Sequence, residues 1–264
     1  MCYDSLVQRK VQSLSRQLAE NLSSWPGVEA VLLAETAEPP VLDPYFILQL
    51  QVLHRGVLPG AEERRRRFES PTGFEAIAAL SEPQDRFLSE MLPVRVRYQE
   101  VQQLEGQLAR IDSNRWTPHE EGTRPFRRLV KGQVLFERGP WLGEVRQRLG
   151  RLPDSFWARL KDQALSATSY ALHDLQASVL RGDDLGYALF LAQFLRGLSA
   201  FLFALNSRFE PPQRLLASEL LSLPRLPDGF AGRFESLLRE EPELPRERKR
   251  EVAELLARSV IKME

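Results

Sequence analysis

Cysteine is nearly absent from this sequence, since Cys2 is the only one among 264 residues. One thiol excludes a disulfide framework and any metal site that needs several cysteines. Histidine is also scarce, and His54, His119 and His173 are too widely spaced for a metal-ligand motif. The first residues lack the basic region and apolar run of a secretory signal. We therefore expect a cytoplasmic protein without disulfides.

Net charge is also absent, because 36 Lys and Arg residues balance 36 Asp and Glu residues. A neutral chain lacks the overall electrostatic attraction to nucleic acid or to an anionic membrane. We expect no nucleic-acid partner, although a local basic patch is compatible with this total.

One long apolar run, Leu185 to Leu205, approaches the length of a membrane span. Arg196 lies at its centre, where an arginine in a bilayer would cost about 2.5–3.5 kcal/mol. Gln193, Arg196 and Ser199 recur at helical spacing. This pattern favours a buried helix of a bundle and no membrane partner, with a membrane span as the alternative.

The first 150 residues mix helix and strand signals. Helical periodicity covers residues 4–24, 72–91 and 100–110, whereas short apolar or alternating runs predict strands at 28–34, 45–53 and 94–98 and an edge strand at 131–136. Glu62 and Glu63 precede Arg66 and Arg67 at i,i+4 spacing, so Arg64 to Arg67 are interpreted as a solvated helix face, with a phosphate or RNA contact as the alternative.

The last 110 residues contain helix signals alone. Helical segments are predicted at 154–181, 184–207, 212–222, 230–240 and 245–262, separated by Gly- and Pro-containing breaks. Gly182 and Asp183 are expected to end one helix and cap the next. The sequence thus predicts an α+β fold: a small mixed sheet with flanking helices in residues 1–150, then an α-helical bundle in residues 151–264.

The order of these segments resembles the nucleotidyltransferase superfamily. The strands of its small mixed sheet are matched in order by VEAVLLA, YFILQLQVL and VRVRY, with Asp43 between the first two. In the second half, LFALN ending at Asn206, then Pro211, Arg214 and the LPRLP stretch from Leu223 resemble the helical domain of the bacterial branch. That branch includes aminoglycoside and lincosamide nucleotidyltransferases.

The resemblance implies a metal site with three carboxylates, and this sequence matches only part of it. Asp43 stands at the first carboxylate position, but Tyr45 occupies the second, and Ala34-Glu35 replaces the Gly-Ser pair that binds phosphates. On the third strand, Arg95 and Arg97 occupy the polar-face positions that could hold the third carboxylate. Two Mg²⁺ ions in such a site need several carboxylates. Asp43 alone makes an incomplete metal site, with Glu35 as a candidate displaced ligand and an ordinary turn as the simpler interpretation of Asp43.

Two functions follow from this pattern. The first is a catalytically degenerate nucleotidyltransferase-fold protein that binds a nucleotide or another small anion, or acts as an interaction module. Arg95 and Arg97 are its candidate anion contacts. Salt-bridged surface arginines are the simpler interpretation of that pair. The second is an active, Mg²⁺-dependent enzyme that transfers a nucleotidyl group from a nucleoside triphosphate to a small hydroxylated acceptor, through Asp43 with Glu35 or Glu100. Trp116, in a polar loop, is expected to fix that loop to the core, with a ligand contact as the alternative.

Overall fold

The structure, a computed structural model, describes residues 2–34, 46–72, 74–81, 84–89, 91–118, 121–239 and 245–263. The chain forms two compact units: residues 1–117 with 125–151, and residues 118–124 with 152–264. The sequence assigns residues 118–124 to the first part of the chain, whereas in the structure they lie with the helical unit.

A six-stranded sheet forms the centre of the first unit, the sheet unit, with strand order β3-β4-β5-β2-β1-β6. β2 and β5 are parallel, and the other neighbouring strands are antiparallel, so the sheet is mixed as expected. The strands are β1 (Val28–Leu33), β2 (Leu48–His54), β3 (Phe74–Ser81), β4 (Gln84–Ser89), β5 (Leu92–Glu100) and β6 (Gln133–Glu137).

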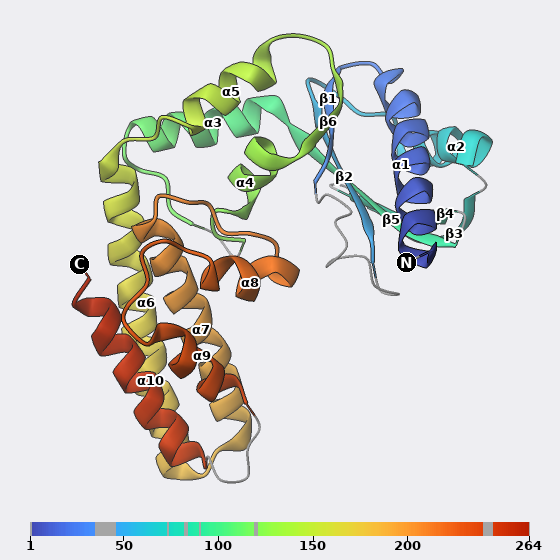
Figure 1. Cartoon of the computed structure of the whole chain (residues 1–264). Coiled ribbons are helices and arrows are strands. Elements are labelled where there is room, and N and C mark those ends of the chain that lie inside the picture. Colours follow the sequence, from blue (N-terminus) through green and yellow to red (C-terminus); the bar gives the residue numbers. More distant parts are fainter. Residues whose placement is uncertain are drawn as a thin grey trace. The chain divides into compact units, whose positions relative to one another are not determined.

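Helices lie on both sides of this sheet (Figure 1). They are α1 (Cys2–Ser23), α2 (Ala61–Thr72), α3 (Val101–Asp112), α4 (Arg124–Lys131, whose first residue belongs to the second unit) and α5 (Trp141–Leu149). α1 and α2 lie on one side, and α3, α4 and α5 on the other. Trp25 follows α1 and is fully buried, with its ring 5.4 Å from Phe68 and 6.1 Å from Tyr98. Burial of these aromatic rings fixes α1 and α2 against the sheet.

The predicted helix at residues 72–91 is wrong, because β3 and β4 occupy most of that range. On β4, Asp85, Phe87 and Ser89 are buried and alternate with more exposed residues, which is the period of a strand. Two of these three inward positions are polar, so the apolar alternation that identifies a strand is missing from the sequence. The apolar residues at helical spacing predicted the wrong element.

Asp85 is buried because Arg64 is its partner. Arg64 on α2 is 1% exposed, and its Nε and Nη2 donate to the two carboxylate oxygens of Asp85 at 2.9 and 3.1 Å. The hydroxyl of Tyr98 also donates to Asp85, at 2.6 Å. The interpretation of Arg64 as solvated is therefore wrong, whereas Arg65 and Arg67 do form exposed i,i+4 ion pairs.

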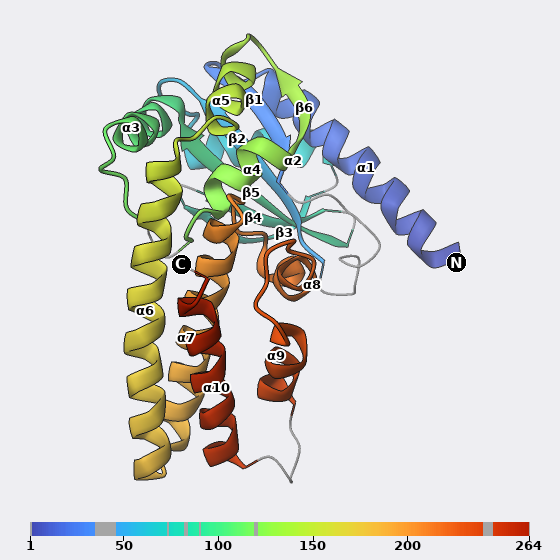
Figure 2. The ribbon, with the colours of Figure 1, turned by 60° about the vertical axis from the view of Figure 1, so that its left-hand side comes forward.

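The second unit, the helical unit, follows the predicted segments closely. Its long elements are α6 (Asp154–Arg181), α7 (Asp184–Leu205), α9 (Phe230–Leu238) and α10 (Arg246–Ile261), with the short η1 (Gln213–Leu215) and α8 (Leu216–Leu221) between α7 and α9. α6, α7 and α10 run side by side (Figure 2). The expected fold class, an α+β sheet region followed by a helical bundle, is confirmed.

The junction between α6 and α7 also forms as predicted. Gly182 ends α6 in the left-handed conformation, with φ of 63°, and the Asp183 carboxylate accepts the Gly186 N–H at the start of α7. Within the described residues, α7 is the one helix long and apolar enough to cross a membrane, and half of its apolar window is buried in the structure.

Candidate functional site

Both arginines predicted on the third strand lie on the polar face of the sheet. Val94, Val96 and Tyr98 of β5 are buried, and Arg95 and Arg97 alternate with them on the opposite face. The parallel pairing of β5 with β2 sets Gln49 beside Arg95 and Gln51 beside Arg97. We call this surface the arginine face. It is polar because both central strands contribute long polar side chains at matching register positions.

A third guanidinium joins the arginine face from another element. Arg128 of α4 lines a cavity of about 10 Å³ together with the two arginines and with Ala34, Gln49, Leu50 and Gln51. Such a volume is close to the minimum that one water molecule needs. Arg128 was missed by the sequence analysis because nothing in the sequence indicates that α4 faces β2 and β5. No Asp or Glu is among the described residues that line this cavity.

The acidic residues predicted as metal ligands are not found together on the described part of the arginine face. Glu35, Asp43 and Tyr45 lie in residues 35–45, outside the described residues. Glu100 shares the strand face of Val96 and Tyr98, which is opposite to that of Arg97. Across the described ranges, no group of three or more His, Cys, Asp or Glu residues could hold a metal ion.

Trp116 is a structural residue of the loop after α3. It is 4% exposed, and its ring lies 5.0 Å from that of Phe126 on α4. It thus fixes the loop to the core, as the simpler interpretation expects.

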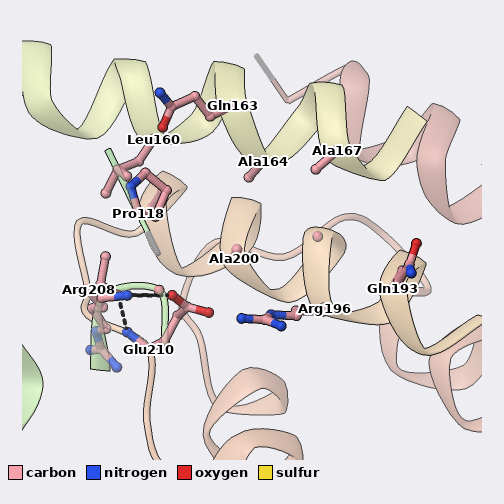
Figure 3. A pocket seen from close by; sticks show the side chains of 14 residues that line it. Pro118, Leu160, Gln163, Ala164, Ala167, Gln193, Arg196, Ala200, Arg208 and Glu210 are labelled. Carbon is pink, nitrogen blue, oxygen red and sulfur yellow. Dashed lines mark hydrogen bonds between the residues drawn. The ribbon is translucent and has the colours of Figure 1, made fainter. Parts of the chain in front are cut away.

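A larger cavity, of about 310 Å³, lies within the helical unit (Figure 3). We call it the helical-unit pocket. One wall consists of α6 residues at helical spacing, and the other of α7 residues at helical spacing. The rim is completed by Pro118, Gly122, Thr123, Arg208 and Glu210. The residues that line it are Pro118, Gly122, Thr123, Leu160, Gln163, Ala164, Ala167, Gln193, Arg196, Gly197, Ala200, Ala204, Arg208 and Glu210.

The sequence signal for this pocket is a set of small residues on facing helix surfaces. Ala164 and Ala167 of α6 and Gly197, Ala200 and Ala204 of α7 recur three or four residues apart. Side chains this small do not fill the space between two helices. The polar positions of α7 were predicted from their helical spacing, whereas this stripe of small residues was not.

Taken together, these features define the class of protein: an α+β chain whose mixed sheet presents arginines on one face, with a separate helical unit that contains a pocket. Comparison with known proteins adds the following similarities. A family described as a domain of unknown function (DUF4037) matches residues 123–214, which include most of the pocket lining. A search of curated proteins found no match.

Among solved structures, the chain is similar to the crystal structure of a nucleotidyltransferase-like protein from Exiguobacterium sibiricum 255-15. The two sequences are 14% identical, and the similarity covers 96% of this chain and 74% of the other, with a TM-score of 0.48.

Proposed function

We propose that this chain is a nucleotidyltransferase-like protein that binds a phosphate-bearing ligand, such as a nucleotide, on the arginine face without a catalytic metal. The observation that carries the proposal is the convergence of Arg95, Arg97 and Arg128 on one cavity of the sheet face. Guanidinium groups bind phosphate oxygens through charge-assisted, often bidentate hydrogen bonds. The ligand binds through its phosphate group against this face, because the cavity itself is small.

The described residues of the arginine face are unfavourable for a metal ion. Mg²⁺ binds through carboxylates and phosphates, and nearby positive charge disfavours it. The described lining of the cavity contains three guanidinium groups and no carboxylate. We infer a catalytically degenerate protein in which arginines replace the metal as the counter-charge of the ligand.

The membership within the superfamily rests on the sequence. The segments from Asn206 to Pro211, Arg214 and Leu223 to Pro227 favour the bacterial branch that contains aminoglycoside and lincosamide nucleotidyltransferases. In the structure, the side chain of Asn206 both donates to and accepts from the backbone of Arg225. Asn206 therefore has a structural role, because its side chain connects the end of α7 to the Leu223–Pro227 stretch through these two hydrogen bonds.

Thermal unfolding of the full chain with ATP or inorganic tripolyphosphate, each with Mg²⁺ or with EDTA, tests the proposal. Ligand at 100 times its dissociation constant adds about 2.7 kcal/mol to the stability of the folded state. We expect a stabilisation that persists in EDTA and that Arg97→Gln reduces. Arg16→Gln, which removes an exposed arginine of α1, is the matched control and should leave the shift unchanged.

Two results would contradict the proposal. If neither ATP nor tripolyphosphate raises the melting temperature, the arginine face is not a phosphate-binding site. A shift that requires Mg²⁺ and is lost in Asp43→Asn would instead identify the active, metal-dependent enzyme.

A further inference from the structure

The helical-unit pocket has the size of a small-molecule site. Its volume of about 310 Å³ falls at the lower end of the roughly 300–1,000 Å³ that is common for ligand pockets. Its two helices are in direct contact at Gly197, where a Cβ atom would lie 2.6 Å from Thr168 Oγ1. Beside this contact, the walls end at the Cβ atoms of Ala164, Ala167 and Ala200 and leave an apolar space.

The rim of the pocket is held in place by hydrogen bonds between distant residues. Glu210 Oε2 accepts from the backbone N–H of Thr123 at 2.9 Å and from its hydroxyl at 3.2 Å, and the Glu210 N–H donates to Thr123 Oγ1 at 2.8 Å. Gly122 has φ of +57°, and a Cβ atom there would lie 2.1 Å from Glu210 Oε2. The glycine therefore permits the close approach that fixes this carboxylate.

This arrangement leaves part of Glu210 available to a ligand. Oε2 accepts both bonds from Thr123, and within the described residues no hydrogen bond or ion pair engages Oε1. A carboxylate held in this way is a preorganised acceptor for an amino or hydroxyl group.

Arg196 supplies the opposite charge. In Figure 3, its guanidinium extends from α7 toward the Glu210 carboxylate across the pocket. In the part of the chain that the structure describes, neither Glu210 nor any other acid forms an ion pair with Arg196. Arg208 also lines the pocket, so two arginines and one glutamate give the lining a net charge of +1.

We propose that the helical-unit pocket binds a small organic acid that has an apolar body and an amino or hydroxyl donor, as an amino acid or a hydroxy acid does. The acidic group bonds to Arg196, the donor bonds to Glu210 Oε1, and the body lies against the alanine walls. The two polar anchors face each other across the pocket, so a ligand that carries both groups at one end satisfies both. This site is separate in its residues from the arginine face.

Calorimetric titration of the full chain with four matched probes tests the proposal. The probes are phenylalanine, 3-phenylpropionate, 3-phenylpropanamide and 2-phenylethylamine, which share a phenyl body and differ in the acidic and amino groups. We expect phenylalanine to bind best, 3-phenylpropionate less well, and the amide and the amine not to bind measurably. Arg196→Gln should weaken phenylalanine binding roughly 10- to 100-fold, as the loss of a charge-assisted hydrogen bond does.

The controls separate this site from the arginine face and from misfolding. Arg196 is exposed, so its replacement should leave the circular dichroism spectrum unchanged. Arg181→Gln, at the exposed end of α6, and Arg97→Gln should both retain binding. The proposal is overturned if neither acidic probe binds, if the amine binds as well as phenylalanine, or if folded Arg196→Gln binds like the parent chain.

Discussion

The two units differ in how they accommodate arginine. In the sheet unit, Arg64 is 1% exposed and is bonded to Asp85 and to the carbonyl of Pro59. In the helical unit, Arg196 is exposed on the lining of a pocket. A charged side chain that is buried away from water needs a partner of opposite charge within the protein. A charged side chain that is exposed to solvent in a pocket does not need one, so it can pair with a ligand instead. The difference separates an arginine that stabilises the fold from one that is available for binding.

The largest expected effect is on the buried pair. Asp85→Asn removes the carboxylate charge that pairs with the buried Arg64 guanidinium. We expect a loss of about 3–5 kcal/mol in the free energy of unfolding, measured by urea denaturation with circular dichroism.

A double replacement checks the cause of that loss. Arg64→Met with Asp85→Leu removes both charges and should recover most of the stability, because well-packed apolar residues often replace a buried ion pair at little cost. If Asp85→Asn alone costs less than about 1 kcal/mol, the ion pair between Arg64 and Asp85 is not shielded from water.

A smaller effect is expected where α6 and α7 meet in the helical unit. Gly197→Ala places a Cβ atom 2.6 Å from Thr168 Oγ1 and 3.1 Å from its backbone nitrogen, so the Thr168 side chain or one of the helices must shift. We expect a loss of about 1–3 kcal/mol by overpacking, measured by urea denaturation.

Gly232→Ala is the matched control, since Gly232 lies within α9 and a Cβ atom there meets nothing within 4 Å. It should stabilise the chain by about 0.5–1 kcal/mol through helix propensity. Equal effects of the two replacements would mean that α6 and α7 are not in close contact at Gly197.

The smallest effect concerns the arginine next to the buried one. Arg65 bonds to Glu69 at 3.0 Å, and both side chains are nearly half exposed. Glu69→Gln should therefore cost no more than about 0.5 kcal/mol, and that loss should diminish in high salt. A loss as large as that of Asp85→Asn would remove the distinction between solvated and buried arginines on α2.

Most of the helical unit could be predicted from the sequence, because its helices have apolar periodicity and are separated by segments that contain glycine or proline. The Gly182–Asp183 junction is an example, since both residues act on the backbone next to them. The strands β1, β2, β5 and β6 were also predicted, from short apolar or alternating runs. β4 could not be, because Asp85 is inward-facing only where Arg64, 21 residues away, supplies its counter-charge.

The candidate site could be predicted only in part. The alternation of β5 was sufficient to place Arg95 and Arg97 on one face. Arg128 comes from another element, and the pairing of Thr123 with Glu210 spans 87 positions of the chain. No periodicity or short motif relates residues at such separations.

The sequence by itself determined the α+β class, the polar side of β5 and the course of the helices in the helical unit, because these depend on interactions between near neighbours. Only the tertiary structure decided which arginine is buried with an acid, which ones gather on a sheet face and which one lines a pocket. The physical reason is that the environment of a charge depends on burial and on partners from distant segments. The balanced total of 36 and 36 charges says nothing about that placement.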